Sequence, residues 1–289
     1  MKISLGPIQY YWPADKIKKF YRQVVDWPVD IVYLGEIVCS KREELNLLDW
    51  QYIADMLSEA GKEVVLSSLA ELDSEEELNA LQHICDNGDY KVEANNSAAI
   101  RLADGRPFVI GPHLKNSNHN FFQKIQSNGA VRWVMPVDYS AARLHLLQKK
   151  RPKNLQTEIF VYGELPLSFS KNCFTAQAHH LTNEHCQLVC KKYNEGMKMR
   201  TDDVEDPMII NGLQIQSGMR CNLINEIENL KLIGIDAVRI SPQINQTQDV
   251  IEQFLQAIQT GKVDSVFFES GKWCNEYWYD EAYGERRII

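Results

Sequence analysis

The segment Ile31-Val-Tyr-Leu-Gly-Glu-Ile-Val-Cys39 has the pattern of a β-strand that is covered on both of its faces. Its first four residues are apolar or aromatic and two of them are β-branched, whereas a strand with one solvated face alternates apolar and polar residues. Strands covered on both faces are typical of parallel sheets flanked by helices. This segment therefore predicts an α/β fold.

Similar short, apolar runs recur along the chain, and amphipathic stretches separate them. Apolar residues keep helical spacing at Ile17, Phe20, Tyr21 and Val24, and again around Phe254. The other predicted strands are Lys2–Leu5, Glu63–Leu66, Lys91–Glu93, Phe108–Ile110, Val131–Val134, Glu158–Val161, Ile209–Ile215, Ala237–Ile240 and Ser265–Phe268. The number of strand–helix units favours a (β/α)8 TIM-barrel-like fold over a doubly wound sheet, in a single domain over residues 1–289.

Composition and charge exclude several classes of protein. The chain has 289 residues and a formal net charge of −8, which argues against a main role on nucleic acid or on an anionic membrane. No run of eighteen apolar residues is present, and the N-terminus lacks the apolar core of a signal peptide. We therefore expect a cytoplasmic protein without a membrane span.

The segment from about residue 168 to 206 interrupts the alternation of strands and helices. It is polar, it holds three cysteines in the pattern Cys173-x12-Cys186-x3-Cys190, and it predicts a cysteine-containing insertion. A helix over residues 183–192 would place Cys186 and Cys190 on one face. Together with Cys39 these cysteines supply four soft thiolates, which is a complete ligand set for one metal centre.

Cysteine chemistry leaves several alternatives open. Seven cysteines in a chain without an export signal are poorly explained as a disulfide framework. Spacing alone favours zinc and an iron–sulfur cluster equally, and Cys39 also has the sequence context of a buried core residue. Three histidines could each replace a thiolate at a zinc ion, and three further cysteines are predicted to be structural. The histidines are His179, His180 and His185, and the structural cysteines are Cys85, Cys221 and Cys274.

Three stretches closely resemble the collagenase-like U-type peptidase superfamily, and the resemblance extends over essentially the whole chain. They are Met1-Lys-Ile-Ser-Leu-Gly-Pro-Ile-Gln-Tyr-Tyr-Trp-Pro13, Val32-Tyr-Leu-Gly-Glu-Ile-Val-Cys39 and Glu158-Ile-Phe-Val-Tyr-Gly-Glu-Leu-Pro-Leu-Ser-Phe-Ser-Lys-Asn-Cys173, which Cys186 and Cys190 follow. The resemblance implies that Cys39, Cys173, Cys186 and Cys190 bind a [4Fe–4S] cluster. It further implies oxygen-independent ring hydroxylation in anaerobic ubiquinone biosynthesis, as a heterodimer with a homologous subunit.

In that role the complex would act on a ubiquinone precursor, delivered by a lipid-carrier protein. The alternatives are a U-type peptidase, a zinc-stabilised binding module and an RNA-modification factor. Proteolysis has little support in the sequence, which contains neither a His-Glu-x-x-His nor a Gly-x-Ser-x-Gly motif. No catalytic residue is assigned, although Asn95 and His113 follow predicted strands and could face the mouth of a barrel.

Overall fold

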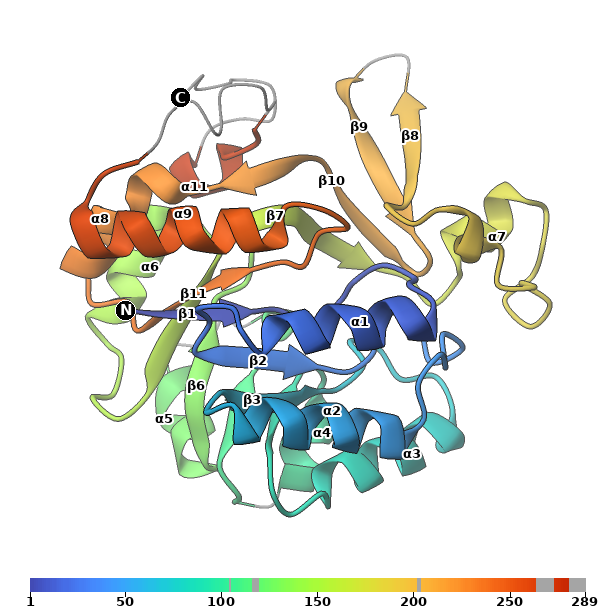
Figure 1. Cartoon of the computed structure of the whole chain (residues 1–289), viewed down its shortest axis with the longest axis horizontal. Coiled ribbons are helices and arrows are strands. Elements are labelled where there is room, and N and C mark those ends of the chain that lie inside the picture. The colour runs from blue at the N-terminus through green and yellow to red at the C-terminus, as the bar shows by residue number, and fades with distance from the viewer. Residues whose placement is uncertain (104, 116–119, 202–203, 264–272, 281–289) are drawn as a thin grey trace.

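The computed structural model describes the chain except for residues 104, 116–119, 202–203, 264–272 and 281–289 (Figure 1). Within the described residues, eight parallel strands form a closed barrel, because β11 pairs with both β1 and β7. These strands are β1 Lys2–Leu5, β2 Ile31–Leu34, β3 Glu63–Ser67, β4 Lys91–Ala94, β5 Phe108–Ile110, β6 Ala130–Val134, β7 Gln156–Phe169 and β11 Ala237–Ile240. The predicted (β/α)8 barrel is confirmed.

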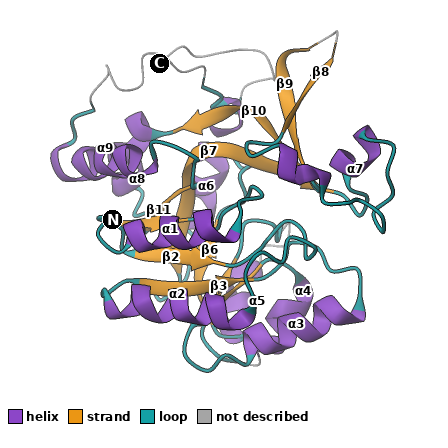
Figure 2. Cartoon of the chain, turned by 45° about the vertical axis from the view of Figure 1, so that its right-hand side comes forward, coloured by secondary structure: helices purple, strands orange, loops and turns teal. Residues whose placement is uncertain are grey.

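Helices surround the barrel as the apolar spacing predicted (Figure 2). They are α1 Ala14–Val24, α2 Leu47–Glu59, α3 Glu75–Cys85, α4 Ser97–Ala103, α5 Phe121–Ser127, α6 Ala141–Gln148, α8 Ile227–Leu232 and α9 Thr247–Thr260, with the short η2 Ile224–Glu226 before α8. Helix α1 buries the predicted residues Ile17, Phe20, Tyr21 and Val24 against the strands. Side-chain caps fix the starts of several helices, for example the capping box of Asn46 at α2.

The two faces of the barrel wall carry different cores. In β2, Val32 and Leu34 belong to the large apolar cluster that includes the helices. Ile31 and Tyr33, which alternate with them, belong to a second cluster with residues of β3, β5, β6 and β11. Because successive side chains of a strand point to opposite faces, this second cluster lies inside the barrel.

The strand β7 continues past the barrel and begins a second, antiparallel part of the sheet. Its C-terminal half pairs with β10 Gln214–Asn222, which pairs with β9 Val204–Asn211, and β9 pairs with β8 Met197–Thr201. In Figures 1 and 2 the β8–β9 hairpin projects away from the barrel. The single strand predicted over Ile209–Ile215 is wrong, because Gly212 takes a left-handed φ of 69° and turns the chain from β9 into β10.

The predicted insertion is present between β7 and β9. It contains α7 Phe174–Ala178, the short 3-10 helix η1 Val189–Lys192, and β8. The helix considered over residues 183–192 does not form, because Gln187 and Leu188 both have a φ of 50° and break any continuous α-helix. The predicted strand Ser265–Phe268 lies outside the described residues. Beyond it, α11 Glu276–Tyr279 packs against α6.

Candidate functional site at the carboxyl end of the barrel

Two of the predicted ligand cysteines lie where barrel enzymes build their sites. Cys39 lies in the β2–α2 loop, just past the carboxyl end of β2, and Cys173 lies after the extended carboxyl end of β7. In such barrels the active site is built at the carboxyl ends of the strands. Cys173 is also the N-cap of α7, and its sulfur accepts a hydrogen bond from the backbone N–H of Ala176 at 3.4 Å.

Exposure divides the seven cysteines into two groups. Cys85, Cys221 and Cys274 are buried, as the sequence predicted for structural residues. The four predicted ligands, Cys39, Cys173, Cys186 and Cys190, are all partly exposed. Cys39 is partly exposed and belongs to neither buried apolar cluster, which differs from the core alternative considered for it.

Hydrogen bonds hold the Cys39 loop against the insertion. Lys41 donates from Nζ to the backbone carbonyl of Asn183, and the Asn183 side chain accepts from the backbone N–H of Cys173 at 2.7 Å. Arg42, which is buried, donates to Oδ1 of Asn211 at 2.8 Å. Segments that are about 140 residues apart in the sequence are thereby joined at one place.

The base of the insertion is tied to the β9–β10 turn. The backbone N–H of Phe174 donates to the carbonyl of Gly212 at 3.0 Å, and the N–H of Gly212 donates to the hydroxyl of Thr175 at 3.0 Å. A Cβ at position 212 would lie 2.7 Å from the guanidinium of Arg42. A glycine at this turn therefore leaves room for Arg42 of the Cys39 loop, while its backbone holds the base of the cysteine segment.

Electrostatic interactions link Cys173 with each of the other three predicted ligands. Burial raises the pKa of Cys173, and the charges of Cys190 and Cys186 raise it further, while backbone amides of α7 lower it. Burial raises the pKa of Cys39 to about 11, with a further contribution from Cys173, while Arg42 and the Lys41 amide oppose the shift. Among the described residues, no three His, Cys, Asp or Glu side chains are grouped closely enough to hold a single metal ion.

Two of the three histidines near the cysteines have hydrogen-bond partners within the insertion. His179 Nε2 lies 2.8 Å from the hydroxyl of Tyr193, and His185 Nδ1 lies 3.3 Å from the hydroxyl of Thr182. His180 is exposed and has a φ of 57°. The Cys39 loop thus contacts the insertion, and two of the histidines are hydrogen-bonded within it.

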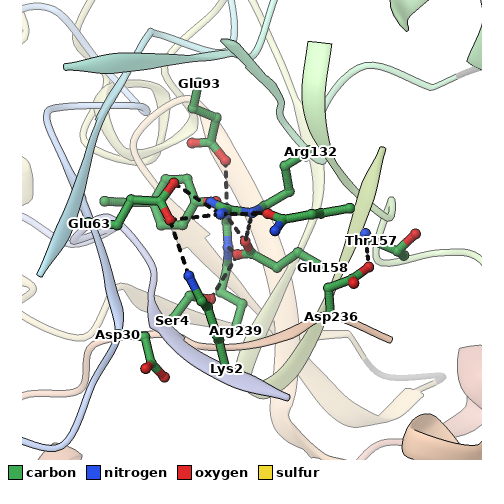
Figure 3. Close-up of polar contacts among 12 residues, drawn as sticks. Lys2, Ser4, Asp30, Glu63, Glu93, Arg132, Thr157, Glu158, Asp236 and Arg239 are labelled. Atoms are coloured by element: carbon green, nitrogen blue, oxygen red, sulfur yellow. Dashed lines mark hydrogen bonds and ion pairs between the residues drawn. The ribbon is translucent and has the colours of Figure 1, made fainter. Parts of the chain in front are cut away.

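A buried charge network inside the barrel was not predicted from the sequence. Glu158 on β7 is fully buried and accepts hydrogen bonds from Arg239 Nε at 2.6 Å, from the Tyr33 hydroxyl at 2.6 Å and from the Ser4 hydroxyl at 2.8 Å (Figure 3). Burial alone would raise the pKa of Glu158, but the two guanidinium groups of Arg239 and Arg132 hold it below its ordinary value.

Further ion pairs complete this network. Arg239 also lies 2.8 Å from Glu93 on β4, and Arg132 lies 3.0 Å from Glu63 on β3 (Figure 3). A sequence signal was available, since single charged residues interrupt apolar strands at Glu93, Arg132 and Arg239. Such residues are retained inside a barrel wall only when they are paired.

The two residues considered for the mouth of the barrel have different surroundings. Asn95 is buried, and its side-chain amide donates to the carbonyl of Ser68 at 2.9 Å, which gives it a structural role. His113 packs edge-on against Phe169, with ring centroids 4.7 Å apart. Burial, followed by the charges of Arg239 and Lys115, lowers the pKa of His113 to about 3, so its imidazole is neutral near pH 7. His113 and Lys115 line a cavity of about 220 Å³.

Comparison with known proteins identifies the family. Residues 15–282 match the sequence profile of peptidase family U32.

Among the described residues, no helix combines the length and apolar character needed to cross a bilayer.

Two solved structures are among those to which this chain shows a weak similarity. A Plasmodium falciparum HPPK-DHPS variant is 10% identical, with a TM-score of 0.44 over 96% of this chain and 48% of its own length. The Bacillus megaterium spore cortex-lytic enzyme SleL is 11% identical, with a TM-score of 0.41 over 87% of this chain and 73% of its own. This chain thus spans about half of the Plasmodium protein. The profile match covers most of the sequence, and the chain belongs to peptidase family U32.

Proposed function

We propose that this chain is the iron–sulfur subunit of an oxygen-independent hydroxylation system in anaerobic ubiquinone biosynthesis, the role implied by its resemblance to UbiV. In this proposal Cys39, Cys173, Cys186 and Cys190 hold a [4Fe–4S] cluster. The chain acts in the cytoplasm as a heterodimer with a homologous, UbiU-like subunit. The substrate of the complex is a ubiquinone precursor, brought by a lipid-carrier protein.

The placement of the cysteines is the observation that carries this proposal. The four predicted ligands are the partly exposed cysteines, whereas the other three are buried. Cys186 and Cys190 raise the pKa of the Cys173 thiol, and Cys173 in turn raises the pKa of the Cys39 thiol. Four thiolates supply the complete ligand set of such a cluster, so the donors present fit the group.

Some neighbouring groups partly offset the rise in pKa that burial causes at Cys39 and Cys173, and the ionised thiol is the form that binds metal. The guanidinium group of Arg42 opposes the rise in the pKa of the Cys39 thiol but does not reverse it. Backbone amides donate to the sulfurs of Cys39 and Cys173, and hydrogen bonds to cluster sulfurs tune reduction potentials.

When bound, a cluster with four cysteine ligands supplies one-electron transfer or structural support, since no iron is left open to a substrate. Residues of this chain would then position the cofactor and exclude water from it. The Cys39 loop, held by Arg42 and Lys41, and the insertion, anchored at Gly212, are the two parts that would enclose it.

A genetic experiment tests the pathway. Deletion of the gene should deplete ubiquinone in cells grown without oxygen and leave the aerobic pool unchanged, because oxygen-dependent enzymes would replace the system. Wild-type protein and Cys85→Ala should restore the anaerobic pool, whereas Cys173→Ala should not. An unchanged anaerobic ubiquinone pool after deletion would contradict the proposal.

A further inference from the structure

An apolar cavity of about 270 Å³ lies beside the loop that carries Cys39. Its walls come from four segments of the chain: the β1–α1 loop with α1, the end of β2 with the β2–α2 loop and the start of α2, the end of β3 with the residue Leu69 after it, and one side of α3. The apolar wall includes Ile8, Trp12, Leu45, Leu47, Trp50 and Ile84. A water molecule occupies about 30 Å³ in the liquid, so the space is large enough for an aromatic ring and part of an attached chain.

Three polar side chains in the wall make hydrogen bonds within the protein. Glu36 accepts hydrogen bonds from two backbone amides of its own loop, at 2.8 and 3.1 Å. Arg42 donates to the carbonyl of Gln9 at 2.9 Å, and Ser40 donates to Glu77 at 2.6 Å. Because most of the wall is apolar, a charged ligand would lose much of its hydration there, and the cavity favours a neutral ligand.

We propose that this cavity binds a neutral prenylated phenol, with its ring among the tryptophans and its chain leaving past Leu47. This inference rests on the proposed function and names the place where the substrate binds. Trp12 and Trp50 offer aromatic surfaces for a ring. Leu47, at the rim, is 56% exposed and offers an apolar exit for a chain longer than the cavity.

The position of the cavity also connects the ligand to the proposed cofactor. Glu36, Ser40 and Arg42 line the cavity, and Cys39 lies between them in the same loop. Cys39 itself does not line the cavity, and Lys41 of the same loop donates a hydrogen bond to the backbone carbonyl of Asn183 in the insertion. The substrate would thus be bound by this chain rather than only by its partner.

Two neighbouring leucines provide a matched pair of variants. Leu47 and Leu48 both lie in the first turn of α2 and are both exposed, at 56% and 80%, but only Leu47 lines the cavity. A glutamate in the first turn of a helix interacts favourably with the helix dipole, so Leu47→Glu and Leu48→Glu should both fold. The two variants differ only in whether the new charge reaches the cavity.

The test is equilibrium dialysis of the full-length, anaerobically purified chain with 2-geranylphenol, and with 4-hydroxybenzoate as a charged ring of similar size. We expect saturable binding of 2-geranylphenol and none of 4-hydroxybenzoate. Leu47→Glu should weaken binding at least tenfold, and Leu48→Glu should leave it within twofold of wild type. Iron and sulfide are measured on the same samples and should be equal in all three proteins.

Other outcomes would overturn the inference. Absence of saturable binding, equal weakening by both variants, or equally tight binding of 4-hydroxybenzoate would each exclude this cavity as the site of a neutral prenylated phenol. Failure of the cofactor proposal would appear separately, as a lack of iron and sulfide in protein that still binds 2-geranylphenol. The two proposals can therefore fail independently.

Discussion

Glu158 is buried completely inside the barrel because two guanidinium groups and two hydroxyls satisfy its carboxylate. The charge of Glu158 also compensates Arg239 and Arg132, which are themselves buried. Removal of one member of such a network leaves the opposite charges in a medium of low polarity. The network therefore constrains which strands can face one another in the barrel.

Glu158→Gln should consequently destabilise the fold by about 3–5 kcal/mol, as loss of one partner of a buried pair does. Urea unfolding at pH 7 measures this loss. The control is Glu228→Gln, which makes the same change in a surface pair with Lys231 and should cost less than about 1 kcal/mol. Similar losses in the two variants would show that the interior network does not stabilise the barrel.

Single residues also show what the sequence could and could not predict. Cys85 was predicted to be buried because it continues the apolar stripe of α3, and the structure confirms this. The partners of Glu158 could not be predicted, because they come from β1, β2, β6 and β11 and meet only when the barrel closes. Periodicity reports the face on which a side chain lies, but it does not report the neighbour across that face.

At the scale of elements, β7 differs most from its prediction. Its barrel portion was predicted from the apolar run at Glu158–Val161, but the strand extends to Phe169 and leaves the barrel near Gly163. Gly163 has a φ of 125°, and a Cβ there would lie 2.6 Å from Cβ of Ser241. This residue lets one strand serve both the barrel and the antiparallel extension that leads to Cys173.

Gly163→Ala should therefore destabilise the protein by roughly 2–3 kcal/mol, from backbone strain and from the clash with Ser241. Gly88→Ala is the control, because Gly88 also has a positive φ, of 81°, but no atom lies within 4 Å of its added Cβ. It should cost about 1 kcal/mol. Thermal or urea unfolding of both variants gives the comparison, and equal losses would contradict a special role for Gly163.

The barrel strands were predictable because each is short, apolar and followed by a helix. The antiparallel extension was not, since β9 and β10 form one apolar run whose turn depends on the single residue Gly212. The left-handed backbone conformation at Gln187 and Leu188 could not be predicted from the sequence either, because neither residue type favours that region. Tertiary contacts of the insertion therefore decide its local structure.

At the scale of the whole molecule, the fold brings together residues from both ends of the sequence. The candidate ligands could be predicted because soft thiolates in a polar segment have few structural explanations. The apolar cavity could not, because its walls come from four separate segments of the chain. The aromatic run Tyr10-Tyr11-Trp12 was its only visible signal, and this run equally suits an ordinary core.

The most direct test of the central claim is the iron, sulfide and zinc content of protein purified without oxygen. We expect about four irons and four sulfides per chain. Cys39→Ala, Cys173→Ala, Cys186→Ala and Cys190→Ala should each lose them, and Cys85→Ala, which changes a buried cysteine, should retain them. One zinc per chain without sulfide, or a full iron content in any of the four variants, would contradict the account.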